Sequence, residues 1–70
     1  MPVVNIQIME GRTPEKIKFV IEEVTKTLSN VLEIPQESVV AIITEVPKSK
    51  YGIGGVPASE IPKFNGSISK

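Results

Sequence analysis

The chain contains no cysteine and no histidine among its 70 residues. Without cysteine no disulfide can hold the fold, and without either residue the usual ligand cluster of a zinc site is missing. We therefore expect no metal. The same absence removes the commonest general base and the strongest nucleophile at neutral pH, so any chemistry must come from a less usual group.

An excess of charge of one sign is also missing, because eight basic and eight acidic residues balance to zero. No strand or helix carries a basic stripe, which argues against a nucleic-acid partner. No segment is long and apolar enough to span a bilayer, and Met1-Pro2-Val3 does not begin a signal peptide. These features predict a cytoplasmic protein without a membrane partner.

Hydrophobic residues make up 40% of the chain, so a folded domain is expected. A chain of this length lies near the lower limit for a self-sufficient core, and such chains often stabilise themselves by oligomerising. We expect residues 1–61 to form one domain, with a mature chain that begins at Pro2. Residues 62–70, where Pro, Asn, Gly, Ser and Lys are frequent, are expected to form a loosely held tail.

Two hydrophobic periodicities follow one another along the first half of the chain. Residues 3–9 alternate between apolar and polar side chains, which predicts a strand. Thr13 and Pro14 are typical of the N-cap and the first turn of a helix. Apolar residues with helical spacing then predict one helix over residues 14–32: Ile17, Val20, Ile21, Val24, Leu28, Val31 and Leu32.

A second strand is expected over residues 39–46, whose first five residues are apolar on both faces. Strand, helix and strand in this order predict a right-handed βαβ crossover with a parallel pair. The Tyr-Gly-Ile-Gly-Gly sequence within Lys48–Val56 predicts a turn or short hairpin. The expected fold class is therefore α/β, with a single βαβ unit and two parallel strands per protomer, plus a short hairpin.

The second strand also predicts self-association. One helix can cover only one face of the sheet, whereas the strand is apolar on both. Another copy of the chain is the simplest cover for the other face, so we expect the protomers to associate sheet to sheet. The alternative is a monomer with an exposed apolar face, which soluble proteins rarely tolerate.

Pro2 is the candidate for an unusual catalytic group. Removal of Met1 would leave Pro2 with a free secondary amine, and an ordinary α-amino group titrates near about 7.7–8.0. Burial and a nearby cation both disfavour the protonated amine, which lowers its pKa and leaves a neutral base at pH 7. Many chains nevertheless begin with Met-Pro for no catalytic reason.

Arg12 and Tyr51 are the other candidates, and each has a simpler explanation. Arg12 is the only arginine, and its planar guanidinium suits a carboxylate or can polarise a carbonyl. It could equally be a surface residue that caps a turn. Tyr51 is one of three aromatic residues and could wall an apolar pocket, or it could simply pack against the hairpin.

Several segments together resemble the 4-oxalocrotonate tautomerase family, in unbroken register from residue 2 to residue 61. They are the Met1-Pro2 start, Glu10-Gly11-Arg12-Thr13, Ile42-Ile43-Thr44-Glu45 and Tyr51-Gly52-Ile53-Gly54-Gly55. The resemblance implies a cofactor-independent isomerase that moves a proton between carbons of a 2-hydroxydienoate or enol to give a conjugated ketone. It also implies protomers that pair into dimers with a four-stranded sheet, and a hexamer of three such dimers with active sites built across subunit contacts.

The resemblance further implies roles for particular residues. Pro2 would be the base and then the acid, and Arg12 would bind the distal carboxylate of the substrate. Tyr51, where the family usually has phenylalanine, would form the apolar wall that keeps the pKa of the amine low. Ser38 and Ile53 would also contact substrate.

Val40 departs from the family pattern, because well-studied members have a second arginine two residues after the serine that corresponds to Ser38. Loss of such a contact costs about 2–4 kcal/mol of transition-state stabilisation. Lys48 or Lys50 could substitute, a partner chain could supply the arginine, or the substrate could have a single carboxylate, which we favour. Hydration, dehalogenation or decarboxylation chemistry, and a non-catalytic or partner-dependent subunit of a mixed hexamer, are the alternative functions.

Overall fold

The computed structural model describes residues 1–64, which form two compact units. The first unit comprises Met1–Ile6 and Thr13–Thr44. The second comprises Gln7–Arg12 and, of the described residues, those from Glu45 to Phe64. Each unit is treated by itself below, and within the described residues no helix is long and apolar enough to cross a membrane.

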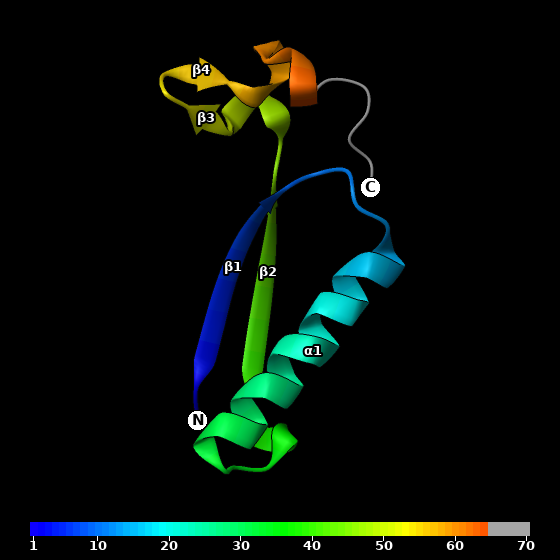
Figure 1. Ribbon diagram of the computed structural model, residues 1–70, viewed down its shortest axis with the longest axis vertical. Coiled ribbons are helices and arrows are strands. Elements are labelled where there is room, and N and C mark those ends of the chain that lie inside the picture. Colours follow the sequence, from blue (N-terminus) through cyan, green and yellow to red (C-terminus); the bar gives the residue numbers. More distant parts are fainter. Residues whose placement is uncertain (65–70) are drawn as a thin grey trace. The chain divides into compact units, whose positions relative to one another are not determined.

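The strands β1 (Val3–Met9) and β2 (Val40–Val46) form a two-stranded sheet (Figure 1). The N–H of Val40 donates to the carbonyl oxygen of Pro2 at 3.0 Å, so the two strands begin side by side. At their other ends the N–H of Glu10 donates to the carbonyl oxygen of Val46 at 2.9 Å. The strands therefore run parallel, as predicted, although β2 begins one residue later than expected.

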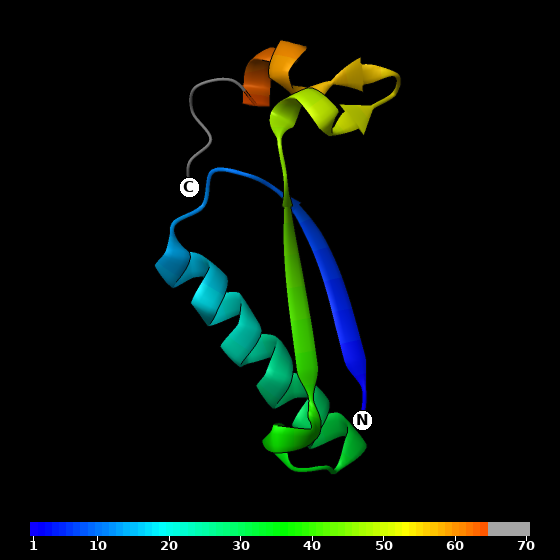
Figure 2. The same cartoon turned by 180° about the vertical axis from the view of Figure 1, so that it is seen from behind.

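The helix α1 (Pro14–Leu32) has the predicted bounds. Thr13 is its N-cap, and the Oγ1 of Thr13 accepts a hydrogen bond from the N–H of Lys16 at 3.2 Å. Pro14 stands in the first turn, where its missing N–H costs no hydrogen bond. The helix ends at Glu33, whose backbone is left-handed with φ of 57°. In Figure 2 the helix and the sheet are seen from behind.

Side chains along β1 alternate in exposure, as expected for a strand with one covered face. Val4 and Ile6 are half-buried, whereas Val3 and Asn5 are exposed. Among the described residues only Ala58 is fully buried, while the side chains of Val3 and Ile42 are 53% and 45% exposed. One protomer alone therefore leaves large apolar side chains in water.

The predicted hairpin lies in the second unit and consists of β3 (Gly52–Ile53) and β4 (Val56–Pro57). The strands are antiparallel, with Gly52 opposite Pro57 and Ile53 opposite Val56. Gly54 and Gly55 connect them with φ of 61° and 87°. Positive φ at both central residues is the signature of a type I′ turn, which explains the two glycines.

Short 3₁₀ turns connect the remaining elements. The residues before the hairpin, Lys48–Lys50, form such a turn and not a strand. Two others are Gln36–Ser38 and Ala58–Glu60. The predicted tail begins with a further 3₁₀ turn, Pro62–Phe64, and the rest of it, residues 65–70, lies outside the described residues. The predicted α/β architecture of a βαβ unit plus a hairpin is confirmed.

Candidate active site

Pro2 immediately precedes β1 and is half-buried, whereas Met1 before it is 85% exposed. The carbonyl group of Pro2 is held by the N–H of Val40. While Met1 is attached, the nitrogen of Pro2 belongs to an amide and has no basic lone pair. Removal of Met1 would place a secondary amine at the start of a strand whose position β2 fixes.

Ser38 ends the 3₁₀ turn Gln36–Ser38 and is half-buried. Its N–H donates to the carbonyl oxygen of Pro35 at 3.0 Å, which sets the direction in which the chain enters β2. Val40 follows two residues later. The first unit thus brings the predicted base, Pro2, beside the position that lacks the second arginine.

Arg12 lies in the second unit, directly after a turn that requires glycine. Gly11 has φ of 120°, a conformation that residues with a Cβ rarely adopt. The Nη1 of Arg12 donates to the carbonyl oxygen of Met9 at 2.9 Å, so Arg12 does cap the turn after β1. A guanidinium has five N–H donors, so this bond leaves most of the group available to a carboxylate.

Tyr51 and Ile53 line one open pocket in the second unit, with a volume of about 440 Å³. Small-molecule sites usually have volumes of about 300–1,000 Å³. Its remaining lining residues are Gln7, Val46, Lys50 and Gly52. The N–H of Ala58 donates to the carbonyl oxygen of Tyr51 at 2.8 Å, which ties the half-buried tyrosine to the fully buried alanine.

Gln7 was not predicted as a pocket residue. The only sequence signal was its place in the alternation of β1, where it is one of the polar residues between apolar ones. Arg12 is not among the lining residues of this pocket. The second unit therefore brings Tyr51 and Ile53 together, but it does not bring Arg12 into the same cavity.

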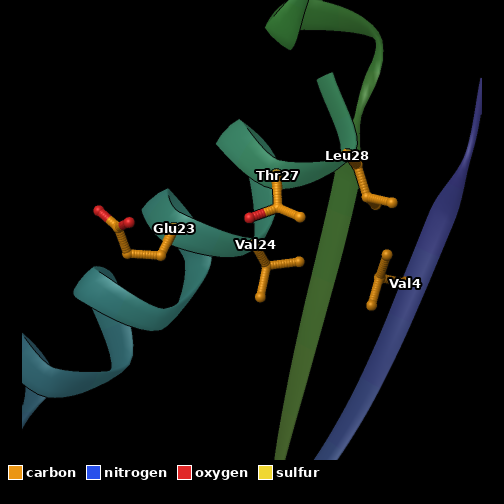
Figure 3. Close-up of a pocket in the computed structure, with 5 residues that line it drawn as sticks. All are labelled: Val4, Glu23, Val24, Thr27 and Leu28. Atoms are coloured by element: carbon orange, nitrogen blue, oxygen red, sulfur yellow. The ribbon is translucent and has the colours of Figure 1, made fainter. Parts of the chain in front are cut away.

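A second, apolar groove of about 310 Å³ lies in the first unit, between α1 and β1. Figure 3 shows Val24, Thr27 and Leu28 projecting from α1 toward Val4 on β1, while the carboxylate of Glu23 points away. Among the described residues Glu23 is the only charged one that lines the groove, and its carboxylate points away from it. It suits apolar packing, and none of the predicted site residues lines it.

The predicted residues are thus divided between the two units. Pro2 and Ser38 belong to the first, whereas Arg12, Tyr51 and Ile53 belong to the second.

The sequence model of the tautomerase enzyme family matches residues 2–61. A 2-hydroxymuconate tautomerase of Pseudomonas putida is 46% identical over 61 residues, which cover 87% of this chain and 97% of the relative. The chain therefore belongs to the tautomerase family, within the group of the 4-oxalocrotonate tautomerases, as its motifs predicted.

Solved structures agree with this assignment. A 4-oxalocrotonate tautomerase isozyme from Methylibium petroleiphilum is 43% identical with a TM-score of 0.80, covering 83% of this chain and 94% of that chain. A subunit of a heterohexameric 4-oxalocrotonate tautomerase from Chloroflexus aurantiacus is 26% identical with a TM-score of 0.83, covering 87% and 98%. The fold and the isomerase class of this chain are those of the tautomerases.

Proposed function

We propose that the chain is a tautomerase for a small 2-hydroxy-enoate or dienoate, with the amine of Pro2 as its general base. The amine takes the proton of the enol hydroxyl, and the electron pair of the O–H bond forms the carbonyl group. The double-bond electrons shift along the conjugated chain, and the protonated amine returns the proton to carbon. Oxidation state is unchanged, so the reaction needs no cofactor.

The position of Pro2 carries this proposal. It follows an exposed Met1, is half-buried, and has its carbonyl fixed by Val40. An amine held at the start of a strand loses part of its hydration, which disfavours the charged form and lowers its pKa. A lowered pKa leaves a larger fraction of neutral amine at pH 7, as a general base requires.

The other predicted residues have binding roles in this proposal. Arg12 holds a substrate carboxylate with the N–H groups that do not bond to Met9. Tyr51 and Ile53 contribute the apolar surface that excludes water from the conjugated chain. Ser38 contacts substrate near the start of β2.

Self-association completes the site. The family resemblance implies active sites built across subunit contacts, so we propose that a substrate touches Pro2 of one protomer and Arg12 of another. The exposed Val3 and Ile42 supply the apolar surface for such an assembly, which we propose to be a hexamer.

A second candidate is a partner-dependent or non-catalytic subunit of a mixed oligomer. Val40 favours it, because the chain has only one arginine and a partner could supply the other. The structural relative from Chloroflexus aurantiacus is a heterohexamer. Purified chain that shows activity only after a second short chain is added would support this candidate.

The proposal is tested with Pro2→Ala in protein whose intact mass shows that Met1 has been removed. The substituted chain retains a free amine, but a primary and more flexible one. We expect the rate of enol-to-keto conversion of phenylenolpyruvate and 2-hydroxymuconate to fall by about 10²-fold or more, the usual contribution of a general base. Conversion at the wild-type rate would show that proline is not the base.

A further inference from the structure

We infer that Lys50 is a substrate-binding residue that takes the second carboxylate of a dicarboxylate substrate in the Tyr51 pocket. This inference rests on the proposed function and identifies its substrate class. It replaces the preference for a single-carboxylate substrate, which depended only on the missing arginine at position 40. The cavity geometry distinguishes between the two lysines that the sequence left as equal alternatives.

The composition of the cavity carries the argument. Among the residues that the structure describes, Lys50 is the only charged one that lines it, and no carboxylate does. The amide of Gln7 and the hydroxyl of Tyr51 are the other polar side chains there. Ile53 and Val46 supply the apolar part. One cation, two neutral hydrogen-bonding groups and an apolar wall suit an anion on a hydrocarbon chain.

Lys50 has no competing partner in the part of the chain that the structure describes. The one ion pair among these residues joins Lys26 to Glu23 on α1. The nearest acidic side chain in sequence, Glu45, does not line the cavity. The ammonium group of Lys50 can therefore pair with a ligand carboxylate without breaking a salt bridge among the described residues.

Lys48 is placed differently although it lies in the same short turn. It does not line the cavity, and its backbone N–H donates to the Oε2 of Glu10 at 3.3 Å. A negative charge is thus already close to the backbone at position 48. Of the two lysines, only Lys50 shares a cavity with Tyr51 and Ile53.

The backbone holds this lysine in position. The N–H of Lys50 donates to the carbonyl oxygen of Pro47 at 2.8 Å. The N–H of Tyr51 donates to the carbonyl oxygen of Lys48 at 3.3 Å. The carbonyl oxygen of Tyr51 in turn accepts a hydrogen bond from the N–H of Ala58. The stem of Lys50 therefore starts from a fixed turn at the cavity edge, while its flexible chain adapts to the ligand.

The chain carries its own probe for this cavity, because Tyr51 is the only tyrosine and there is no tryptophan. Tyrosine fluorescence thus reports on this pocket alone. Adipate, a transparent six-carbon dicarboxylate that cannot react, serves as ligand, and hexanoate is the matched monocarboxylate. Titrations are made at constant ionic strength on the assembled protein, with wild type, Lys50→Gln, Lys50→Arg, Lys48→Gln and Lys18→Gln.

We expect a saturable fluorescence change with adipate that is weakened about fivefold in Lys50→Gln, as for an exposed charge pair with a hydrogen bond. Lys50→Arg should bind like wild type, and Lys18→Gln, on the exposed face of α1, should be unaffected. Hexanoate, whose single carboxylate is held by Arg12 in the proposed function, should bind more weakly and be nearly insensitive to Lys50→Gln. Absence of saturable adipate binding by wild type, equal binding by Lys50→Gln, or a larger loss in Lys48→Gln overturns the inference.

Activity separates this inference from the proposed function. Lys50→Gln should raise the KM for 2-hydroxymuconate while leaving kcat/KM for phenylenolpyruvate within twofold of wild type. Turnover of both enols with unchanged KM in Lys50→Gln contradicts the role of Lys50 and leaves the tautomerase proposal intact. Lys50-dependent adipate binding without turnover of any enol contradicts the tautomerase proposal instead.

Discussion

The backbone N–H of Val40 donates to the carbonyl oxygen of Pro2 at 3.0 Å, so the predicted base is held by the residue at the position where the family resemblance implies an arginine. An arginine at that position could stabilise charge that develops on the substrate. Here a half-buried valine offers only apolar surface.

Restoring the arginine tests this relationship. Val40→Arg should raise kcat/KM for 2-hydroxymuconate by about tenfold or more, because it returns a charge-assisted contact to the site. In the double variant Val40→Arg/Lys50→Gln the KM for this substrate should no longer depend on position 50. Val40→Met, which is similar in length but uncharged, is the control, and a gain of the same size in that variant would exclude the charge as the cause.

Arg12 should bind the substrate carboxylate through the paired N–H donors of its planar guanidinium group. Arg12→Ala should lower kcat/KM for both enol substrates by about 10–100-fold, the value of a hydrogen bond to a charged group. Arg12→Lys should recover little, since an ammonium cannot make the paired bonds. Steady-state kinetics with both substrates provide the measurement, and full recovery by lysine would show that only charge is needed.

The two glycine turns should respond differently to the same substitution. Gly54 has φ of 61° in the left-handed region that asparagine tolerates, whereas Gly11 has φ of 120°. No atom lies within 4 Å of a Cβ built on either residue, so the cost is one of backbone strain alone. Gly54→Asn should cost little and Gly11→Asn about 1–3 kcal/mol in the free energy of unfolding.

Urea denaturation at one fixed protomer concentration measures both variants, since the stability of an oligomer depends on concentration. Equal losses at the two positions would contradict the explanation by φ. Gly11→Asn should also weaken substrate binding, because this turn aims Arg12.

The exposed side of the sheet should be a protomer contact. Ile42 is 45% exposed in the single chain, and Ile42→Glu would place a charge in an apolar contact. We expect sedimentation velocity to show a smaller species with reduced activity. Lys18→Glu, on the exposed face of α1, is the control and should leave the assembly intact; an unchanged assembly in Ile42→Glu would contradict the proposed contact.

The sequence predicted most of the fold because its patterns are local. The alternation over residues 3–9 and the Thr13-Pro14 cap were enough to place β1 and α1. The diglycine in the hairpin has the positive φ values that its turn requires. The 3₁₀ turn at Lys48–Lys50 was not predicted, because a single turn leaves no periodicity in the sequence.

The candidate site was less accessible to sequence reasoning. Pro2, Arg12 and Tyr51 were recognised as a combination of motifs, but neither composition nor spacing could show which lysine shares a cavity with Tyr51. That depends on how Gln7 and Val46 meet the hairpin in space. A lone polar residue in a strand, such as Gln7, looks the same in sequence whether it faces water or a ligand.

The central claim, that the free amine of Pro2 is the base, is tested most directly by blocking that amine while leaving proline in place. Chain carrying a Gly-Ser extension before Pro2 has an amide nitrogen there, and its kcat/KM for phenylenolpyruvate is compared with that of processed chain across pH. We predict that processed chain gains activity as pH rises through an amine pKa lowered from the usual range of an α-amino group by loss of hydration, and that the blocked chain is at least about 10²-fold slower. Equal rates for blocked and processed chains would contradict the account.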